Sequence, residues 1–527
     1  MVKKIVKKIK VRKLINDNKK NTDSKLENQN NDSSMSKNIE DNMKIIQDTF
    51  LGSSDLNIRS FFLGMDNKKA FIVNIEGLYD KKIVNENAIA PLMKDLKEKI
   101  PSGEISIENI KNYVINVDNV EILNAMEEVI DNILCGSTVL FQDGEGKALS
   151  ISAMAREHRN IDMPQTENTI RGPHEGFIEV LSTNIALVRD IIKSPDLKVE
   201  TLKIGKRTRT DVSLLYIKSL ADNKIVEEVK KRLNSIDIDA ILESGYIEEF
   251  IEDSPLSPFP TVGNTETPGK FSAKLLEGRV GILVGGSPTA LTVPYLFIEA
   301  FQGAEDYYTG AIVSSQLRLI RFIAFHINLF LSGLYVALQG FHPNMIPKKL
   351  LLTMQVTREG LPLPAVVEAA GLIIAWEILR EAGVRMPRPI GQALSIVGAL
   401  IIGQVAVNAG LVSPLMIIMV AMTGIMSLLT SPLNDAASVL RIPILIVASV
   451  FGLFGVIWCY FFMIIHLTSI RSFGVPYMSP ALPFGLSGMK DYMIRVPWWL
   501  MKARPKLINR KDLQRVRSIN MPSPKKK

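Results

Sequence analysis

The chain has 527 residues, long enough for several domains, and its 62 Lys and Arg side chains outnumber its 54 Asp and Glu side chains for a formal charge of +8. That positive charge is concentrated at the two ends. Residues 1–20 carry nine basic side chains and one acidic, and residues 471–527 carry thirteen and two, so the stretch between them is net acidic. Because a nucleic-acid-binding protein carries its positive charge on a folded domain, this distribution argues against a nucleic-acid partner.

Residues 1–41 are predicted to form a disordered basic leader, because Asn, Asp, Lys and Ser dominate its second half and cannot bury enough apolar surface to fold. The start of the leader places Val2, Val6 and Ile9 at near-helical spacing. A helix lying on an anionic membrane surface is therefore the alternative to a solvated tail. No apolar stretch of the signal-peptide type follows the basic residues, so we expect the N-terminal half to stay in the cytoplasm.

The polar half of the chain is predicted to be an α/β fold of two subdomains. The first subdomain is placed at residues 42–180, with a strand at 70–75, a helix at 119–133 and a hairpin of 137–141 with 148–151 around Asp143-Gly144. The second is placed at residues 181–253, with a helix at 182–192, strands near 198–204 and 211–217, and a helix at 223–233.

A proline-rich stretch, residues 254–270, is predicted to be a stiff connector, because proline fixes φ and removes a hydrogen-bond donor. Residues 271–318 follow it as a membrane-proximal hairpin and helix. The hairpin prediction rests on Gly285-Gly286, which lies between two apolar β-prone runs. An open hairpin cannot face lipid, so we expect it at the membrane surface.

Three runs without a charged side chain exclude a purely soluble protein. They span residues 322–347, 389–434 and 442–470, and about 20 apolar residues in a helix cross a bilayer core. We therefore predict an all-α membrane domain over residues 319–470 and a basic cytoplasmic tail over 471–527. The predicted spans are 322–341, 390–409, 412–430 and 442–468, with an amphipathic helix at 365–383 whose crossing of the membrane stays open. Four spans place both termini on the cytoplasmic side.

Span 390–409 is rich in small and polar residues and is unlike a lipid-facing helix. The candidate pore-lining residues recur on one helical stripe of this span: Gly391, Ser395, Gly398 and Ile402. Polar side chains at membrane depth commonly face water or a protein interior, but close packing of helices through small residues is the alternative. Gln404 and Asn408 lie off the stripe and are candidates for hydrogen bonds to neighbouring helices.

Patterns typical of an enzyme or a metal site do not occur. The five His residues are scattered, with no H-E-x-x-H, and no G-x-S-x-G is present. Gly144-Glu145-Gly146-Lys147 lacks the earlier glycine and the following hydroxyl residue of a phosphate-binding loop. Cys135 and Cys459 lie in different halves of the chain, so we expect no disulfide between them. We predict no catalytic residues, no cofactor and no metal.

Several long motifs resemble the A subunits of GerA-type spore germinant receptors. They are RGPHEGF (171–177), ESGYIEEFIEDSPLSPFPTV (243–262), LLEGRVGILVGGSPTALTVPYLF (275–297), FQGAEDYY (301–308), SSQLRLIR (314–321) and RSFGVPYMSP (471–480). The resemblance covers residues 45–500, and motifs of this length in this order are specific. Thr267 and Gly269 stand where the family tends to have Arg and Asp, and Gly285 replaces the usual Asp of the hairpin turn.

The resemblance implies a subunit of a nutrient-sensing receptor in the spore inner membrane, with its soluble half facing the spore core. It also implies two partners, a transporter-like B subunit that senses the nutrient and a lipoprotein C subunit, in contact with membrane lipids. Subunits of this kind are expected to form homo-oligomers, by resemblance pentamers, that act as nutrient-gated ion channels. This expectation favours the pore interpretation of span 390–409 over helix packing.

Three alternatives stay open. A SpoVAF-like accessory channel shares the membrane half, although the long Asn- and Lys-rich leader favours the receptor subunit. A scaffold that only anchors the other receptor subunits would conduct no ions. A solute carrier would show an inverted repeat with broken helices, and four predicted spans without internal symmetry argue against it.

Overall fold

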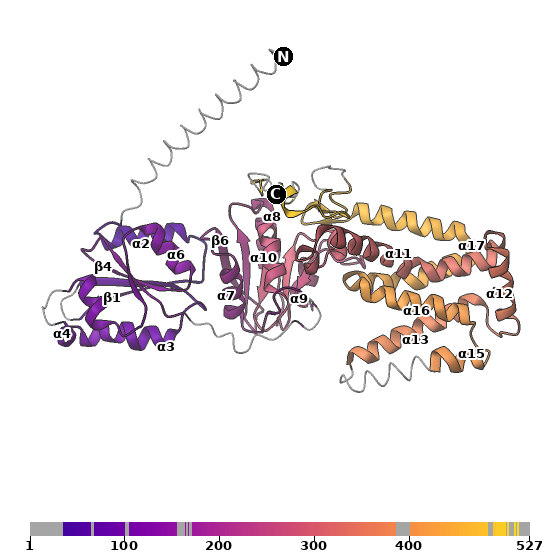
Figure 1. The fold of residues 1–527 in the computed structure, drawn as a ribbon, viewed down its shortest axis with the longest axis horizontal. Coiled ribbons are helices and arrows are strands. Elements are labelled where there is room, and N and C mark those ends of the chain that lie inside the picture. Colours follow the sequence, from indigo (N-terminus) through magenta and orange to yellow (C-terminus); the bar gives the residue numbers. More distant parts are fainter. Residues whose placement is uncertain are drawn as a thin grey trace, which may run out of the picture.

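In the computed structural model of the chain, two α/β units are followed by a bundle of long helices (Figure 1). The residues that the structure describes are 35–64, 68–100, 105–154, 164, 167, 171–385, 401–482, 489–501, 503–504, 508, 511–512 and 514–515. Sheets occupy the N-terminal half and helices dominate the C-terminal half. The half of the sequence with short apolar runs between charged residues therefore forms sheets, and the half with long uncharged runs forms helices.

The first unit is an antiparallel five-stranded sheet with helical segments on both faces (Figure 1). Its strands lie in the order β1 (Leu56–Leu63), β2 (Lys68–Ile75), β4 (Thr138–Gln142), β5 (Ala148–Ile151) and β3 (Val120–Leu123). Successive side chains of a strand point to opposite faces, so Phe71 and Val73 pack with α2 (Ile39–Thr49) and α6 (Met126–Leu134). The other face is covered by short segments: α3 (Lys81–Val84), η1 (Asn85–Ile89), η2 (Pro91–Asp95), α4 (Leu96–Lys99), α5 (Ile107–Asn109) and η3 (Ile110–Val114).

The start of this unit lies earlier than the sequence prediction placed it. Helix α2 begins at Ile39, inside the predicted leader 1–41. The reason is hydrophobic burial, because the Ile39 and Ile46 side chains are part of the core under the sheet. Asn38 accepts a hydrogen bond from the Glu40 backbone N–H and caps the first turn.

The predicted helix 119–133 is a strand followed by a helix. Strand β3 pairs with β5, with Val120 opposite Ile151, and so completes the sheet edge. Helix α6 starts at Met126 because the Glu128 carboxylate accepts a hydrogen bond from the Asn124 backbone N–H at 3.1 Å. Strand pairing and the cap together override the helical spacing of the apolar residues.

The second unit is also an antiparallel five-stranded sheet, between two layers of helices. Its strands lie in the order β6 (Leu197–Ile204), β7 (Thr210–Ile217), β9 (Val280–Val284), β10 (Ala290–Val293) and β8 (Gly263–Thr265). Helices α7 (Leu181–Ile191) and α10 (Pro268–Leu276) share one core with the sheet. Helices α8 (Asn223–Ser235) and α9 (Ser244–Ile251) share the other.

The hairpin predicted at the membrane surface lies instead inside this second sheet. Strand β9 pairs with β7 on one side and β10 on the other, with Val284 opposite Val212. All five β9 residues are buried, and Ile282 and Leu283 pack into cores on opposite faces. A fully buried central strand is apolar throughout, which is why this run resembles a membrane-associated segment. The second unit therefore extends past residues 181–253 and includes three strands from the predicted connector and hairpin regions.

The helical part begins with two short 3-10 segments, η5 (Phe297–Phe301) and η6 (Ala304–Tyr307). The longer helices are α11 (Ala311–Phe341), α12 (Lys348–Arg358), α13 (Ala365–Arg385), α16 (Pro414–Leu429) and α17 (Asn434–Ser469). Shorter segments between and after them are η7 (Pro343–Met345), η8 (Ile401–Val405), α15 (Ala406–Asn408), η9 (Ser431–Leu433), β11 (Arg471–Ser472), β12 (Val475–Pro476) and η10 (Trp498–Leu500). Helices α11 and α17 run side by side (Figure 1).

Two helices in the described part of the chain are long and apolar enough to cross a membrane: residues 311–341 and 431–469. They contain the predicted spans 322–341 and 442–468. Helix α16 lies within predicted span 412–430 and is shorter, at 16 residues. Residues 386–400, most of predicted span 390–409, lie outside the described residues. The prediction of four spans therefore stays a prediction.

Candidate functional site

The second α/β unit is joined to the first long apolar helix by a buried ion cluster centred on Asp306. Arg318 Nε donates to Asp306 Oδ2 at 3.0 Å, and Arg321 Nη1 donates to Asp306 at 2.9 Å. Asp306 lies in η6, just before α11, and the two arginines lie three residues apart in α11, which places them on one helix face. A charge removed from water is stable only when it is paired and hydrogen-bonded, and Asp306 meets both conditions.

The C-terminal segment closes this cluster from the other side. The Asp491 carboxylate accepts hydrogen bonds from Arg318 Nη1 and from the Tyr307 hydroxyl, both at 2.8 Å. Burial, and then the negative charge of Asp491, raise the pKa of Tyr307 well above its usual value, so this hydroxyl remains a donor. Trp498 Nε1 in turn donates to the Tyr307 carbonyl oxygen at 3.3 Å. Two regions far apart in the sequence, residues 306–321 and the C-terminal segment with Asp491 and Trp498, therefore meet at one joint.

Aromatic rings extend the joint toward the helical bundle. Phe301 of η5 lies 5.4 Å from Phe322 and 5.8 Å from Phe325, both in α11, between ring centroids. Phe297 contacts Tyr477, beyond the end of α17, at 6.0 Å. The two edge-on pairs of Phe301 contribute about 0.5–1.5 kcal/mol each beyond area burial. The core of the second sheet is continuous with these rings, so the second α/β unit and the bundle share one hydrophobic core.

A second buried charge cluster connects α10 to η5. Glu299 accepts a hydrogen bond from Lys274 Nζ at 2.5 Å and pairs with Arg279 Nη1 at 2.7 Å. Burial lowers the pKa of Lys274 despite the nearby Glu299 carboxylate. Burial alone would raise the pKa of Glu277, but the positive charges of Lys274, Arg279 and Arg515 outweigh it and lower that pKa. Helix α10, the start of the bundle and the C-terminal segment are thus held by one set of charges.

Inside the bundle, buried polar side chains link helices to one another. Arg441 of α17 donates to Asn328 Oδ1 of α11 at 2.6 Å and to Glu377 Oε1 of α13 at 3.0 Å. A buried guanidinium is costly unless it is paired and hydrogen-bonded, and Arg441 has both kinds of partner here. Since the contact bridges three helices, displacement of one helix affects the other two.

Most of the predicted pore stripe lies outside the described residues. Gly391, Ser395 and Gly398 lie outside the described residues, and only the backbone of Ile402, in η8, is described. Of the candidates for interhelical hydrogen bonds, Gln404 and Asn408 are both exposed. Neither side chain makes a hydrogen bond to the described part of the chain.

The ion cluster of the joint was missed by the sequence analysis. Asp306 lies in FQGAEDYY and Arg318 in SSQLRLIR, two motifs used only for the resemblance. The signal that could have found them is the presence of two arginines three residues apart immediately before an uncharged run, with an acidic pair just upstream. Within the described residues, no group of three or more His, Cys, Asp or Glu side chains is arranged to hold a metal ion.

Comparisons with known proteins agree with the resemblance. A family model described as Bacillus/Clostridium GerA spore germination protein matches residues 44–507. Spore germination protein KA of Bacillus subtilis (strain 168) is 42% identical over 494 residues, which cover 93% of this chain and 90% of that protein. The uncharacterized membrane protein YfkQ of the same organism is 41% identical over 92% of this chain and 94% of that protein.

Among solved structures, the N-terminal domain of the A subunit of the Bacillus megaterium spore germinant receptor GerK3 is 35% identical. It covers 50% of this chain and 98% of its own length, with a TM-score of 0.37. The family match extends over most of the chain, through both sheets and the helical bundle. The chain therefore belongs to the GerA family of Bacillus/Clostridium spore germination proteins.

Proposed function

We propose that this chain is the A subunit of a nutrient-sensing spore germinant receptor and that its oligomer is a ligand-gated ion channel. Membership of the GerA family and the names of its relatives support the receptor assignment. The observation that carries the gating part is the Asp306–Arg318 ion pair, because it ties the soluble half to the first long apolar helix without exposing either side chain. A rearrangement of the soluble half can then move that helix as a rigid unit.

The proposed assembly contains a transporter-like B subunit and a lipoprotein C subunit, and several copies of this chain, by family resemblance five. It lies in the spore inner membrane as a multi-pass protein, with both termini on the core side. Accessibility labelling tests the topology. With Cys135 and Cys459 replaced by Ser, single cysteines at Ser24 and Ser523 should resist an impermeant reagent added outside. Labelling of either position contradicts the four-span arrangement.

The proposed pore is lined by span 390–409, with Gly391, Ser395 and Gly398 around a wide, weakly polar section. Ile402 is the bulkiest apolar side chain of the stripe, and a ring of such residues closes a pore by dewetting. Gln404 and Asn408 lie off the stripe and are assigned to contacts with neighbouring helices.

The test replaces Ile402 with Ala or Ser and measures both subunit abundance and ion release in the absence of nutrient. A wider, wetter ring leaks ions, so premature germination or loss of ions during spore formation is expected. Reduced abundance without leak instead indicates a packing role, since a cavity at this position costs about 1–3 kcal/mol. That outcome removes Ile402 from the pore.

Two alternatives are tested by two measurements, conduction and the nutrient specificity of germination. A non-conducting scaffold for the other subunits gives no current when the purified oligomer is reconstituted in a planar bilayer. A SpoVAF-like accessory channel conducts, but deleting it leaves the nutrient specificity of germination unchanged. Nutrient-dependent current from the assembled receptor supports the A-subunit assignment against both.

A further inference from the structure

A cavity of about 550 Å³ lies where the edge of the second sheet meets the turn between α16 and α17. One part of its wall comes from α9, β8, β10 and α10, and another part comes from residues 431–435. Cavities of about 300–1,000 Å³ between separate elements are typical of small-molecule sites. Neither the ion cluster at Asp306 nor the proposed pore uses this space, which we call the acidic cavity.

The charged lining of the acidic cavity is net negative. Among the described residues that line it, six side chains are acidic and two are basic. Both basic side chains are already paired, Lys270 with Glu167 and Lys274 with Glu299. Three of the remaining acidic side chains form no ion pair in the described part of the chain: Glu248, Glu252 and Asp435. The lining therefore favours a cation.

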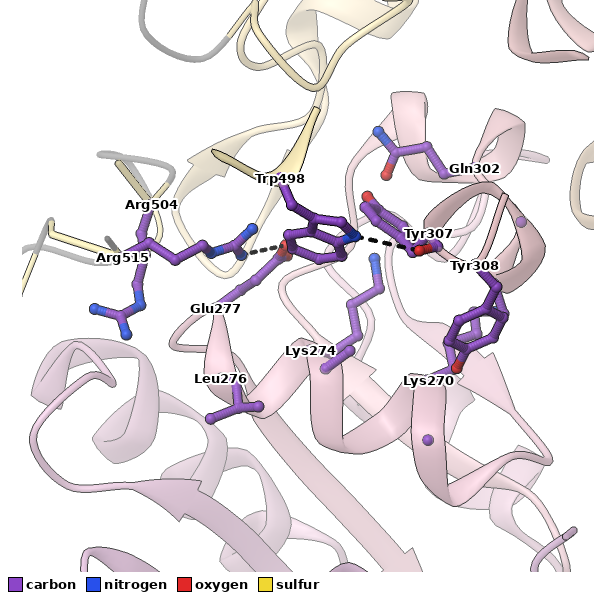
Figure 2. A pocket seen from close by; sticks show the side chains of 14 residues that line it. Lys270, Lys274, Leu276, Glu277, Gln302, Tyr307, Tyr308, Trp498, Arg504 and Arg515 are labelled. Atoms are coloured by element: carbon purple, nitrogen blue, oxygen red, sulfur yellow. Dashed lines mark hydrogen bonds and ion pairs between the residues drawn. The ribbon is translucent and has the colours of Figure 1, made fainter. Parts of the chain in front are cut away.

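The neighbouring cavity of about 380 Å³ has no such excess of charge. Figure 2 shows its lining, in which Lys270 and Lys274 take part in both cavities. Its other two basic side chains are also paired with carboxylates: Arg504 with Asp512 and Arg515 with Glu277. The unpaired charge thus lies on the side of the acidic cavity.

The three unpaired carboxylates come from two separate elements. Glu248 lies in α9 and Glu252 follows it by four residues, so the two side chains lie on one side of that helix. Burial, and then the negative charges of Glu252 and Glu243, raise the pKa of Glu248 to about 7. Asp435 lies in the first turn of α17, in another part of the wall. A bound cation would supply the positive charge that these carboxylates lack.

A buried tyrosine hydroxyl in the same wall also lacks a partner. Tyr295 is 9% exposed and lines the cavity, and its hydroxyl forms no hydrogen bond in the described part of the chain, although a buried tyrosine hydroxyl usually has one. Burial, and then the nearby Tyr477 and Glu299, raise the pKa of Tyr295 well above its usual value, so the hydroxyl stays neutral. Glu299 and Glu167, whose charges also act on this hydroxyl, belong to the cavity wall, which places the hydroxyl on the cavity side. An ammonium group can donate to its oxygen.

An organic amine fits this lining better than a metal ion. A metal ion needs oxygen ligands that converge on one point, and no three His, Cys, Asp or Glu side chains among the described residues are arranged in that way. Ammonium groups spaced along a flexible chain can instead reach carboxylates on separate elements. The wall already binds two ammonium groups of this kind, since Glu167 and Glu299 each pair with a lysine of α10 at 2.5 Å.

We propose that the acidic cavity binds a small aliphatic polyamine. Its ammonium groups face Glu248 and Glu252 in one part of the wall and Asp435 in another, and one of them donates to the Tyr295 hydroxyl. Bound in this way, the polyamine connects α9 with the start of α17, and therefore the second unit with the helical bundle. The site is independent of ion conduction and of the other receptor subunits, so it is tested on this chain alone.

The first experiment compares three cations that differ in the number and spacing of their charges. The full-length chain in phosphatidylcholine nanodiscs is titrated calorimetrically with spermidine, n-butylamine and Ca²⁺ at one ionic strength, and empty nanodiscs correct for binding to lipid. The pH is about 8, above the pKa of Glu248. We expect spermidine to bind saturably and at least about tenfold more tightly than either other cation. Equal or tighter binding of butylamine or Ca²⁺ overturns the proposal, and so does the absence of saturable spermidine binding.

The second experiment locates the binding. Glu248→Gln and Asp435→Asn remove one charge each from different parts of the wall, and each should weaken spermidine binding by at least about fivefold. Both substitutions keep the shape of the side chain, and Glu248→Gln also removes a repulsion, so folded protein is expected. The matched control is Glu249→Gln, the same change at the next position of α9, which is exposed and does not line the cavity. Unchanged affinity in either cavity variant, or an equal loss in the control, overturns the assignment to this cavity.

Discussion

Arg318 and Asp306 form an ion pair in which neither side chain is exposed, with Arg318 Nε 3.0 Å from Asp306 Oδ2. The pair joins the first long apolar helix to the segment that leads out of the second sheet. Asp306 also pairs with Arg321 at 2.9 Å, so one carboxylate is the counter-ion of two guanidinium groups. Removing its charge would leave both without their shared counter-ion.

We therefore expect Asp306→Asn to lower the free energy of unfolding by about 3–5 kcal/mol, the cost of breaking a buried pair from one side. The amide keeps the shape of the carboxylate, so the loss reports charge rather than volume. Thermal unfolding of the purified chain and subunit abundance in the membrane measure it.

The control for this change is Asp237→Asn, the same substitution in a pair with Lys206 whose side chains are 71% and 65% exposed. An exposed pair contributes about 0–1 kcal/mol to stability. The melting temperature of the Asp237→Asn variant should therefore remain close to that of the original chain. Similar losses in both variants would mean that the buried pair contributes no more to the free energy of unfolding than an exposed pair does.

Local elements were predictable from the sequence, and their partners were not. The Asp143-Gly144 turn predicted a hairpin of 137–141 with 148–151, and β4 and β5 confirm it. The turn at Gly285-Gly286 also predicted a hairpin correctly, but its strands lie in the second sheet, because β9 pairs with β7, which is about 70 residues earlier in the chain. Apolar character alone does not distinguish a buried central strand from a membrane-associated one.

The candidate site shows the same limit more strongly. Asp491 bonds Arg318 across 173 positions of sequence, and no periodicity connects residues so far apart. Helical spacing predicted a stripe with Ile402 at its end, which stays a prediction, and spacing carries no information about which neighbour a stripe faces. Charged residues next to uncharged runs are the sequence feature that indicates such a cluster. A charge buried there requires an oppositely charged partner from another part of the chain.

Glu368 should be needed to hold the start of α16 in place. Its buried carboxylate accepts a hydrogen bond from the Ser413 hydroxyl at 2.7 Å and pairs with Arg358 of α12 at 3.0 Å. Glu368→Gln removes the counter-ion of Arg358, and we expect a loss of about 3–5 kcal/mol in the free energy of unfolding. The control is Glu381→Gln near the other end of α13, where Glu381 forms an exposed pair with Arg385. It should have little effect on the free energy of unfolding. Equal melting temperatures for the two variants would contradict this role.

Gly452 allows a sharp break in α17 that another residue would strain. Its φ is 61° and its ψ is −144°, and a Cβ there would lie 2.8 Å from the Phe341 ring at the end of α11. Gly452→Ala should therefore cost about 1–3 kcal/mol from backbone strain, with a further loss from the clash. Gly340→Ala is the control, because a Cβ at that position meets nothing within 4 Å. Equal melting temperatures for Gly452→Ala and Gly340→Ala would argue against a non-helical backbone at Gly452.

Glu248 should make the stability of the second unit depend on pH. Burial, and then the negative charges of Glu252 and Glu243, raise the pKa of Glu248 from its ordinary value of 4.5 to about 7. Between these values the folded chain binds more protons than the unfolded chain, so the free energy of unfolding falls as the pH rises from 4.5 to 7. Glu248→Gln, which cannot ionise, should remove that part of the slope and raise the melting temperature most at pH 7 and above. Thermal unfolding at half-unit pH steps measures it, with Glu249→Gln on the exposed side of the same helix as the control that keeps the slope. A slope that survives Glu248→Gln unchanged would assign the pH dependence to another group.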